Sequence, residues 1–132
     1  MTPAQIMPSL FGDVISTFMG VPKATDPNAT DAEVVVSGVP FDLACSGRSG
    51  TRMGPNAIRQ STANLIWEGR RWPWDFALEE RLQVCDAGNL DYAYGEPESL
   101  VDNLETHAMR WLNAGKKMLT LGGDHYISLP LL

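Results

Sequence analysis

Three short strand-like segments constrain what this chain can fold into. Residues 33–39 are a β-branched run with apolar side chains on both faces, which is typical of a strand covered on both sides of a sheet. Residues 82–86 and 117–121 are two further strand-like runs, and each of them ends in a glycine-containing turn. Strands that are buried on both faces occur in parallel sheets packed between helices.

Helical patterns fill both intervals between these strands. Pro55 stands at a first helical position, and the residues at helical spacing after it are Ile58, Thr62, Leu65 and Ile66. Ser99 is expected to cap a second helix and Gly115 to end it, with an apolar stripe of Leu100, Leu104, Ala108, Trp111 and Leu112. The alternation of strand and helix predicts an α/β fold with a parallel sheet.

The predicted domain spans residues 33–132. Residues 1–32 are expected to form an irregular arm, because prolines and glycines recur along them: Pro3, Pro8, Gly12, Gly20, Pro22 and Pro27. Residues 128–132 read as the first turn of a further helix. Since three strands are few for a parallel sheet, we expect part of a larger α/β domain, truncated after the third recognisable strand.

Composition and charge exclude several classes of function. Sixteen acidic residues against ten basic ones give a net charge of −6, and the basic residues are scattered, so no nucleic-acid-binding surface is predicted. No apolar segment is long enough to cross a membrane, and the N-terminus lacks a leader pattern, which predicts a cytoplasmic protein. Cys45 and Cys85 are then expected to be reduced. Cys85 should be a buried strand residue, and a catalytic Cys45 is not favoured.

The most informative motif is residues 122–125, Gly-Gly-Asp-His, directly after the third strand. The glycine pair permits a sharp turn, and the Asp-His that follows lies where open α/β sheets bind ligands. A carboxylate and an imidazole together suit a divalent metal. His125 is a candidate metal ligand, but one histidine and one aspartate do not make a metal site, and from these residues alone a loop histidine that only forms hydrogen bonds is favoured. Asp124 is expected to shape the turn or to support a ligand rather than to ligate directly.

Other polar and aromatic features receive no functional role from the residues alone. The glycine-rich loop 46–55 lacks the spacing of a phosphate-binding loop, so a structural loop or the rim of an active site is favoured. His107 is interpreted as a partly buried or surface helix histidine. A cover for the sheet or a subunit contact is favoured over substrate stacking for Trp67, Trp72 and Trp74. No role is assigned to the aspartates that follow strands, Asp42, Asp86 and Asp91.

Several motifs in order resemble the ureohydrolase family, which includes arginases and agmatinases, and most closely its agmatinase branch. They are residues 37–42 (SGVPFD), 46–59 (SGRSGTRMGPNAIR) and 121–125 (LGGDH), with residues 64–68 and 72–76 of the connector, 80–82, 86–90 and 114–116. The resemblance covers residues 33–132. It implies a three-layer α/β/α sandwich around a parallel sheet.

The resemblance also implies a reaction and a cofactor. A centre of two manganese ions would activate a bridging hydroxide, which attacks a guanidinium carbon and releases urea. His125 matches the histidine that ligates the first manganese. The intact protein would be a homo-oligomer that converts agmatine and water to putrescine and urea, in putrescine biosynthesis. A relative acting on another guanidino compound, such as guanidinobutyrate, is the alternative.

The other family ligands come from downstream Asp-x-His-x-Asp and Asp-x-Asp segments that this sequence does not contain. No catalytic residue is therefore assigned within the chain, its substrate-binding residues stay unknown, and the chain alone is expected to be inactive. A non-catalytic partner of full-length subunits, or a relic of a truncated gene, is the alternative from another class of function.

Overall fold

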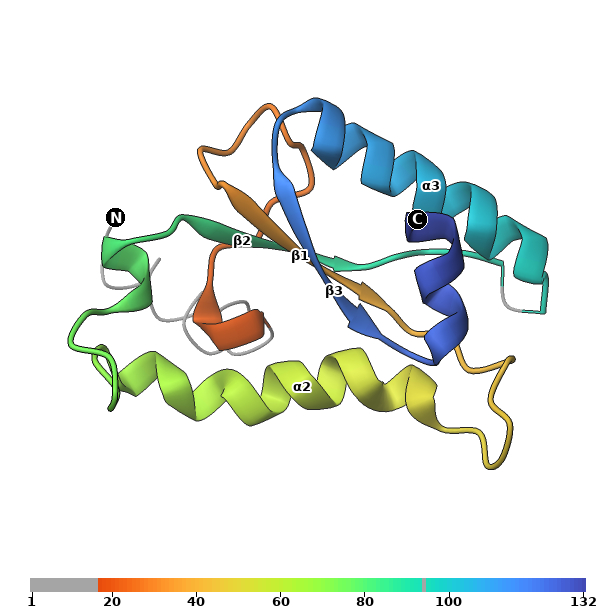
Figure 1. Ribbon diagram of the computed structural model, residues 1–132, viewed down its shortest axis with the longest axis horizontal. Coiled ribbons are helices and arrows are strands. Elements are labelled where there is room, and N and C mark those ends of the chain that lie inside the picture. The colour runs from red at the N-terminus through yellow and green to blue at the C-terminus, as the bar shows by residue number, and fades with distance from the viewer. Residues whose placement is uncertain (1–16, 94) are drawn as a thin grey trace, which may run out of the picture.

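The computed structural model describes residues 17–93 and 95–132. Within them the chain forms a three-stranded parallel sheet in the order β2-β1-β3, with β1 (Val34–Val39) in the centre, β2 (Val84–Asn89) and β3 (Lys117–Gly122). Figure 1 shows the helices α2 (Gly54–Thr62) and α3 (Pro97–Asn113) on opposite sides of this sheet. The predicted α/β/α layering around a parallel sheet is confirmed.

The strand predictions are confirmed, with one shift along β2. This strand begins two residues later than expected and continues to Asn89. Its register against β1 changes between Val36 and Gly38, so that Gly38 lies opposite Asn89. This irregularity lets β2 continue through the Ala-Gly-Asn turn that the sequence pattern placed outside the strand.

The second helix differs from its prediction at both the first turn and the apolar stripe. Ser99 is not the cap: α3 begins at Pro97, and the Ser99 hydroxyl donates to the Glu96 carbonyl oxygen at 2.8 Å. A proline fits the first helical position because its missing N–H needs no partner there. Leu112 was expected in the buried stripe but is 52% exposed. Gly115 ends the helix as predicted, with a φ of 77° that favours glycine.

The helix that begins near Pro55 buries a different face from the one its apolar spacing indicated. Its inner face carries Pro55 and Arg59, while Ile58 is 38% exposed. The helix continues as a 3₁₀ segment from Ala63 to Trp67. Gly54 lies against the end of β3, where an added Cβ would come within 2.6 Å of the Gly122 carbonyl oxygen. A glycine is thus required for α2 to approach the sheet this closely.

Two apolar clusters between α3 and the sheet make up the core. One contains Val39, Phe41, Leu100, Leu104 and Ile127; the other contains Ala32, Val35, Cys85 and Trp111. Cys85 is buried, as predicted, and burial raises the pKa of its thiol.

The tryptophans of the connector after α2 do not cover the sheet. Trp67, Trp72 and Trp74 are all exposed, so the sheet-covering role was wrong. Their use as a subunit contact stays a prediction.

The described part of the predicted arm, residues 17–32, lies along the sheet. Lys23 forms an isolated parallel bridge with Asp86, and the Ala24 amide donates to the Asp86 carbonyl oxygen at 3.1 Å. Residues 1–16 lie outside the described residues. The outer side of β2 is therefore occupied by this segment.

A buried ion pair joins α2 to β2. The Arg59 Nε and Nη2 atoms each donate to a different oxygen of Asp86 at 2.9 Å, and the two side chains are 5% and 1% exposed. The Asp86 carboxylate also accepts the Phe18 amide at 2.7 Å and the Gly88 amide at 2.8 Å. Asp86, to which no role was assigned from the sequence, is therefore a structural anchor.

A partly buried hydrogen bond joins α3 to the central strand. The Ser37 hydroxyl and the His107 Nε2 atom are 2.8 Å apart. Burial, and secondarily the Arg110 guanidinium, lowers the pKa of the His107 imidazole below its ordinary value of 6.5. The interpretation of His107 as a partly buried helix histidine is confirmed.

Replacing Asp86 by Asn should lower the free energy of unfolding by about 3–5 kcal/mol, because Arg59 would keep a buried charge without its carboxylate. Urea unfolding measures this change. The control is Asp102→Asn, an exposed aspartate of α3, which should change stability by about 0.5 kcal/mol or less. Equal effects of the two substitutions would contradict the anchoring role of the pair.

Acidification should destabilise the chain in part through His107. The unfolded chain takes up a proton near pH 6.5, whereas the folded chain takes it up on His107 only at lower pH. The stability contributed by the neutral imidazole is therefore present above pH 6.5 and is lost as the pH falls through the lower, folded pKa. Urea midpoints measured from pH 7.5 to 5 should fall less steeply in His107→Gln. An unchanged slope would rule out this contribution.

Candidate functional site

The carboxyl ends of β1 and β3 bring two loops together. The Asp124 amide donates to the Phe41 carbonyl oxygen at 2.8 Å, which joins the turn after β3 to the loop after β1. Gly123 has a φ of 51°, and a Cβ added there would contact the carbonyl oxygens of Val39 and Phe41. The second glycine of the Gly-Gly pair is thus needed for close approach as well as for turning.

Asp124 holds this arrangement with its carboxylate. The side chain is buried; its Oδ1 atom accepts the Tyr126 amide at 2.9 Å, and its Oδ2 atom accepts the Ala44 amide at 2.8 Å. The first contact caps the C-terminal 3₁₀ segment, His125–Leu131, and the second fixes the loop after β1. This geometry agrees with the expected turn-shaping role.

His125 begins the C-terminal 3₁₀ segment and is exposed. The backbone of its turn is held by the Asp124 contacts, so the imidazole extends from a fixed position at the carboxyl ends of the strands. Among the described residues, no group of three or more His, Cys, Asp or Glu side chains could hold a metal ion. A divalent metal needs more donors than one imidazole, so these residues alone do not fit a manganese centre.

The loop after β1 is held by a second carboxylate, to which no role was assigned from the sequence. Asp42 is buried and accepts the Gly50 amide at 2.9 Å and the Arg52 guanidinium at 3.0 Å. The glycine-rich loop is therefore closed on itself beside the turn that carries His125. The aspartate directly after the strand was the signal for this role, but the sequence could not show its partners.

Cys45 lies in the same loop but has no histidine as a hydrogen-bond partner. Its Sγ atom is 3.2 Å from the Thr51 hydroxyl and 4.0 Å from Asp124 Oδ2. Nucleophilic cysteines are usually activated by a neighbouring histidine or positive charge, and the two groups in contact with Cys45, a hydroxyl and a carboxylate, are neither. The geometry thus gives Cys45 no catalytic role.

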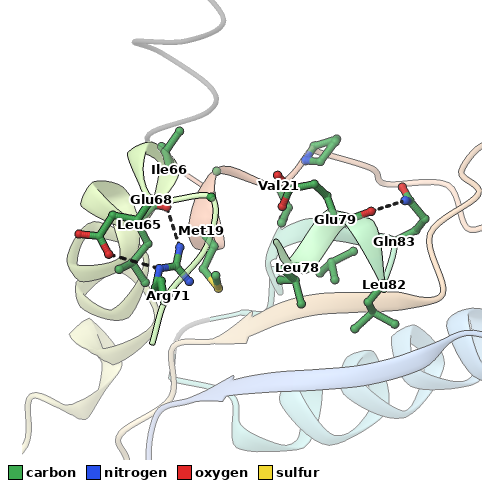
Figure 2. Close-up of a pocket in the computed structure, with 14 residues that line it drawn as sticks. Met19, Val21, Leu65, Ile66, Glu68, Arg71, Leu78, Glu79, Leu82 and Gln83 are labelled. Atoms are coloured by element: carbon green, nitrogen blue, oxygen red, sulfur yellow. Dashed lines mark hydrogen bonds and ion pairs between the residues drawn. The ribbon is translucent and has the colours of Figure 1, made fainter. Parts of the chain in front are cut away.

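A separate hollow of about 300 Å³ lies between residues 19–22, the end of the α2 extension and the start of β2. Figure 2 shows Arg71 on one side of it, where its guanidinium donates to the Leu65 carbonyl oxygen at 2.6 Å and pairs with Glu68 at 3.6 Å. The other side is formed by Leu78, Glu79, Leu82 and Gln83. None of the predicted site residues lines this hollow, so it is not the candidate site.

The chain matches a model of the arginase family over residues 32–132. It is 54% identical over 115 residues to the agmatinase of Sodalis glossinidius and 51% identical to that of Proteus mirabilis. Each alignment covers 87% of this chain but 38% of the relative, so the chain spans well under half the length of these curated relatives.

Solved structures share this fold. A hypothetical agmatinase from Burkholderia thailandensis superposes with a TM-score of 0.81 at 40% identity, covering 88% of this chain and 36% of that one. Proclavaminate amidino hydrolase from Streptomyces clavuligerus superposes with a TM-score of 0.74 at 29% identity, and the match covers 88% of this chain and 38% of that one. Formiminoglutamase from Trypanosoma cruzi with Mn²⁺ superposes with a TM-score of 0.64 at 26% identity, and the match covers 87% of this chain and 38% of that one.

Replacing Asp124 by Asn should loosen the junction of the two loops. One carboxylate oxygen would become an amide NH₂ group, which cannot accept a backbone N–H, so about 1–3 kcal/mol of stability should be lost. Hydrogen exchange should accelerate at the Ala44 and Tyr126 amides. The matched control is Asp91→Asn, an exposed aspartate, which should leave both amides unchanged. Equal protection in both variants would contradict the junction role.

Proposed function

The chain belongs to the arginase family, and on that premise we propose that it is part of a manganese-dependent agmatinase, which converts agmatine and water to putrescine and urea. The observation that carries this proposal is 54% identity to a curated agmatinase over 115 residues. The geometry supports it, because the Gly-Gly-Asp-His turn presents His125 at the carboxyl ends of the strands, where α/β enzymes bind ligands.

His125 is proposed as one manganese ligand of the intact enzyme. Its ring is exposed, while the buried Asp124 and the close-packed Gly123 hold the backbone on which it stands. Support of this kind orients a metal ligand without contacting the metal. The remaining ligands would come from the longer polypeptide that the curated relatives have. The described residues alone are proposed to release no urea.

Agmatine is preferred to other guanidino compounds as the substrate. Identity to the agmatinases is 51–54%, whereas identity to proclavaminate amidino hydrolase is 29%. That enzyme nevertheless shares the fold, so the scaffold described here accommodates more than one substrate. Guanidinobutyrate is therefore the second substrate to assay.

The described residues contain no helix long and apolar enough to cross a membrane. We propose a cytoplasmic location, and a homo-oligomer for the full-length enzyme, by analogy with the family.

The test of this function is a chimera in which residues 1–132 replace the matched segment of the Sodalis glossinidius agmatinase. With manganese present, the chimera should release urea from agmatine faster than from guanidinobutyrate. A folded, manganese-loaded chimera that releases no urea from agmatine would overturn the proposed function.

In the same chimera, His125→Ala should lower the bound manganese and reduce urea release by about 100-fold or more, because a direct ligand is lost. Metal analysis of the purified protein measures the stoichiometry. The control is His107→Gln, since His107 is the only other histidine of the 132 residues and binds Ser37 instead. Full manganese content in His125→Ala would refute the ligand assignment.

A further inference from the structure

The loop after β1 and the turn after β3 leave the sheet toward opposite faces. From β1 the chain runs to α2, whereas from β3 it runs into the C-terminal 3₁₀ segment, which packs against α3 on the other face (Figure 1). Because β1 and β3 are neighbours in the sheet, this is a topological switch point, where open α/β sheets bind their ligands. A substrate held near His125 is therefore expected to lie between the loop after β1 and the turn after β3.

The loop after β1 carries positive charge close to this place. Residues 43–53 contain two arginines, Arg48 and Arg52, and no acidic residue. Near the start of the loop, the Ala44 amide donates to the Asp124 carboxylate, which ties the loop to the turn after β3. Agmatine is a dication, with a guanidinium at one end and a primary ammonium at the other. An uncompensated arginine beside the site would therefore repel it.

Asp42 compensates one of these positive charges. Its Oδ2 atom accepts both the Gly50 amide at 2.9 Å and the Arg52 guanidinium at 3.0 Å. The Asp42 side chain is 7% exposed and that of Arg52 is 55% exposed, so a buried carboxylate is joined to a cation on the surface of the loop. The carboxylate weakens the field that Arg52 exerts on its surroundings and holds the guanidinium close to the base of the loop.

We propose that the Asp42–Arg52 ion pair determines substrate specificity: by neutralising Arg52, it prevents the loop after β1 from repelling a substrate with a cationic far end and from attracting one with a carboxylate there. Asp42 is thus a positioning residue that acts through Arg52. This inference rests on the proposed function, because it concerns which guanidino compound the site near His125 accepts. Agmatine and guanidinobutyrate test it, since they share the guanidinium and carry an ammonium and a carboxylate, respectively, at the other end.

The experiment measures kcat/KM for both compounds in the manganese-loaded agmatinase chimera and takes their ratio as the preference for agmatine. Asp42→Asn keeps an oxygen acceptor but removes the negative charge, so Arg52 is uncompensated and the preference should fall by about fivefold or more. Arg52→Gln leaves the carboxylate uncompensated instead, and the preference should rise by about twofold or more. Asp42→Asn combined with Arg52→Gln removes both charges and should restore the preference to within about twofold.

Glu80→Gln is the matched control. It leaves Arg70 unpaired in the same way, since Glu80 and Arg70 form an exposed ion pair at 3.6 Å outside the two loops at the switch point. The preference for agmatine should stay within about twofold of that of the unmodified chimera. In the Asp42 and Arg52 variants the change should appear mainly in KM, because the charge acts on the far end of the substrate throughout the reaction. Dissociation constants from titration calorimetry give the same ratio without turnover.

A merely structural role of Asp42 would lower kcat/KM for both compounds together, so an unchanged ratio in Asp42→Asn would overturn the proposal. A ratio that moves in the same direction in both single variants would overturn it as well. If Asp42→Asn does not fold, Arg52→Gln decides alone, and an unchanged or lowered preference there overturns the proposal. A chimera that binds both compounds but hydrolyses neither contradicts only the proposed function, because the dissociation constants still test the ion pair. Binding of neither compound would overturn both.

Discussion

The packing of α2 depends on the buried ion pair between Arg59 and Asp86. The Asp86 carboxylate accepts hydrogen bonds from the Phe18 and Gly88 amides as well as from the Arg59 guanidinium. This one side chain therefore joins a helix, a strand and the segment before β1. A buried charge of this kind is tolerated only when nearly all of its hydrogen bonds are made. With α2 held in this way, Gly54 lies directly against the end of β3. The ion pair thereby also supports the strand that ends in the candidate site.

The candidate site is organised mainly by backbone contacts and two carboxylates. Asp124 and Asp42 accept backbone amides from the loop after β1, and Gly123 leaves the space in which the two loops meet. These contacts fix the position of His125 without using its ring. A ligand held by a rigid backbone needs little reordering when a metal arrives, which lowers the entropic cost of binding. The described residues thus position one imidazole, that of the proposed ligand His125, and contain no cluster of further ligands.

The strand and helix order and the Gly122–His125 turn could be predicted from the sequence because each depends on local pattern. Apolar runs, proline and glycine act over a few residues. The Arg59–Asp86 pair could not be predicted from the sequence, since its members are 27 residues apart and a charged residue in a helix is usually exposed. The prediction that Trp67, Trp72 and Trp74 cover the sheet was wrong because large aromatic side chains are usually expected to be buried, whereas these three are exposed. The prediction that Ser99 caps the second helix was wrong because the helix begins earlier, at Pro97, a residue that suits the first turn.

Strand β3 leads directly into the candidate site. Its carboxyl end leads into the turn with His125, whereas its outer edge has no strand neighbour among residues 17–93 and 95–132. In the isolated chain β3 is held by β1 on one side only, so its free energy of local opening is that of an edge strand. The turn that carries His125 is held instead by the contacts of Asp124 and Gly123 with the loop after β1.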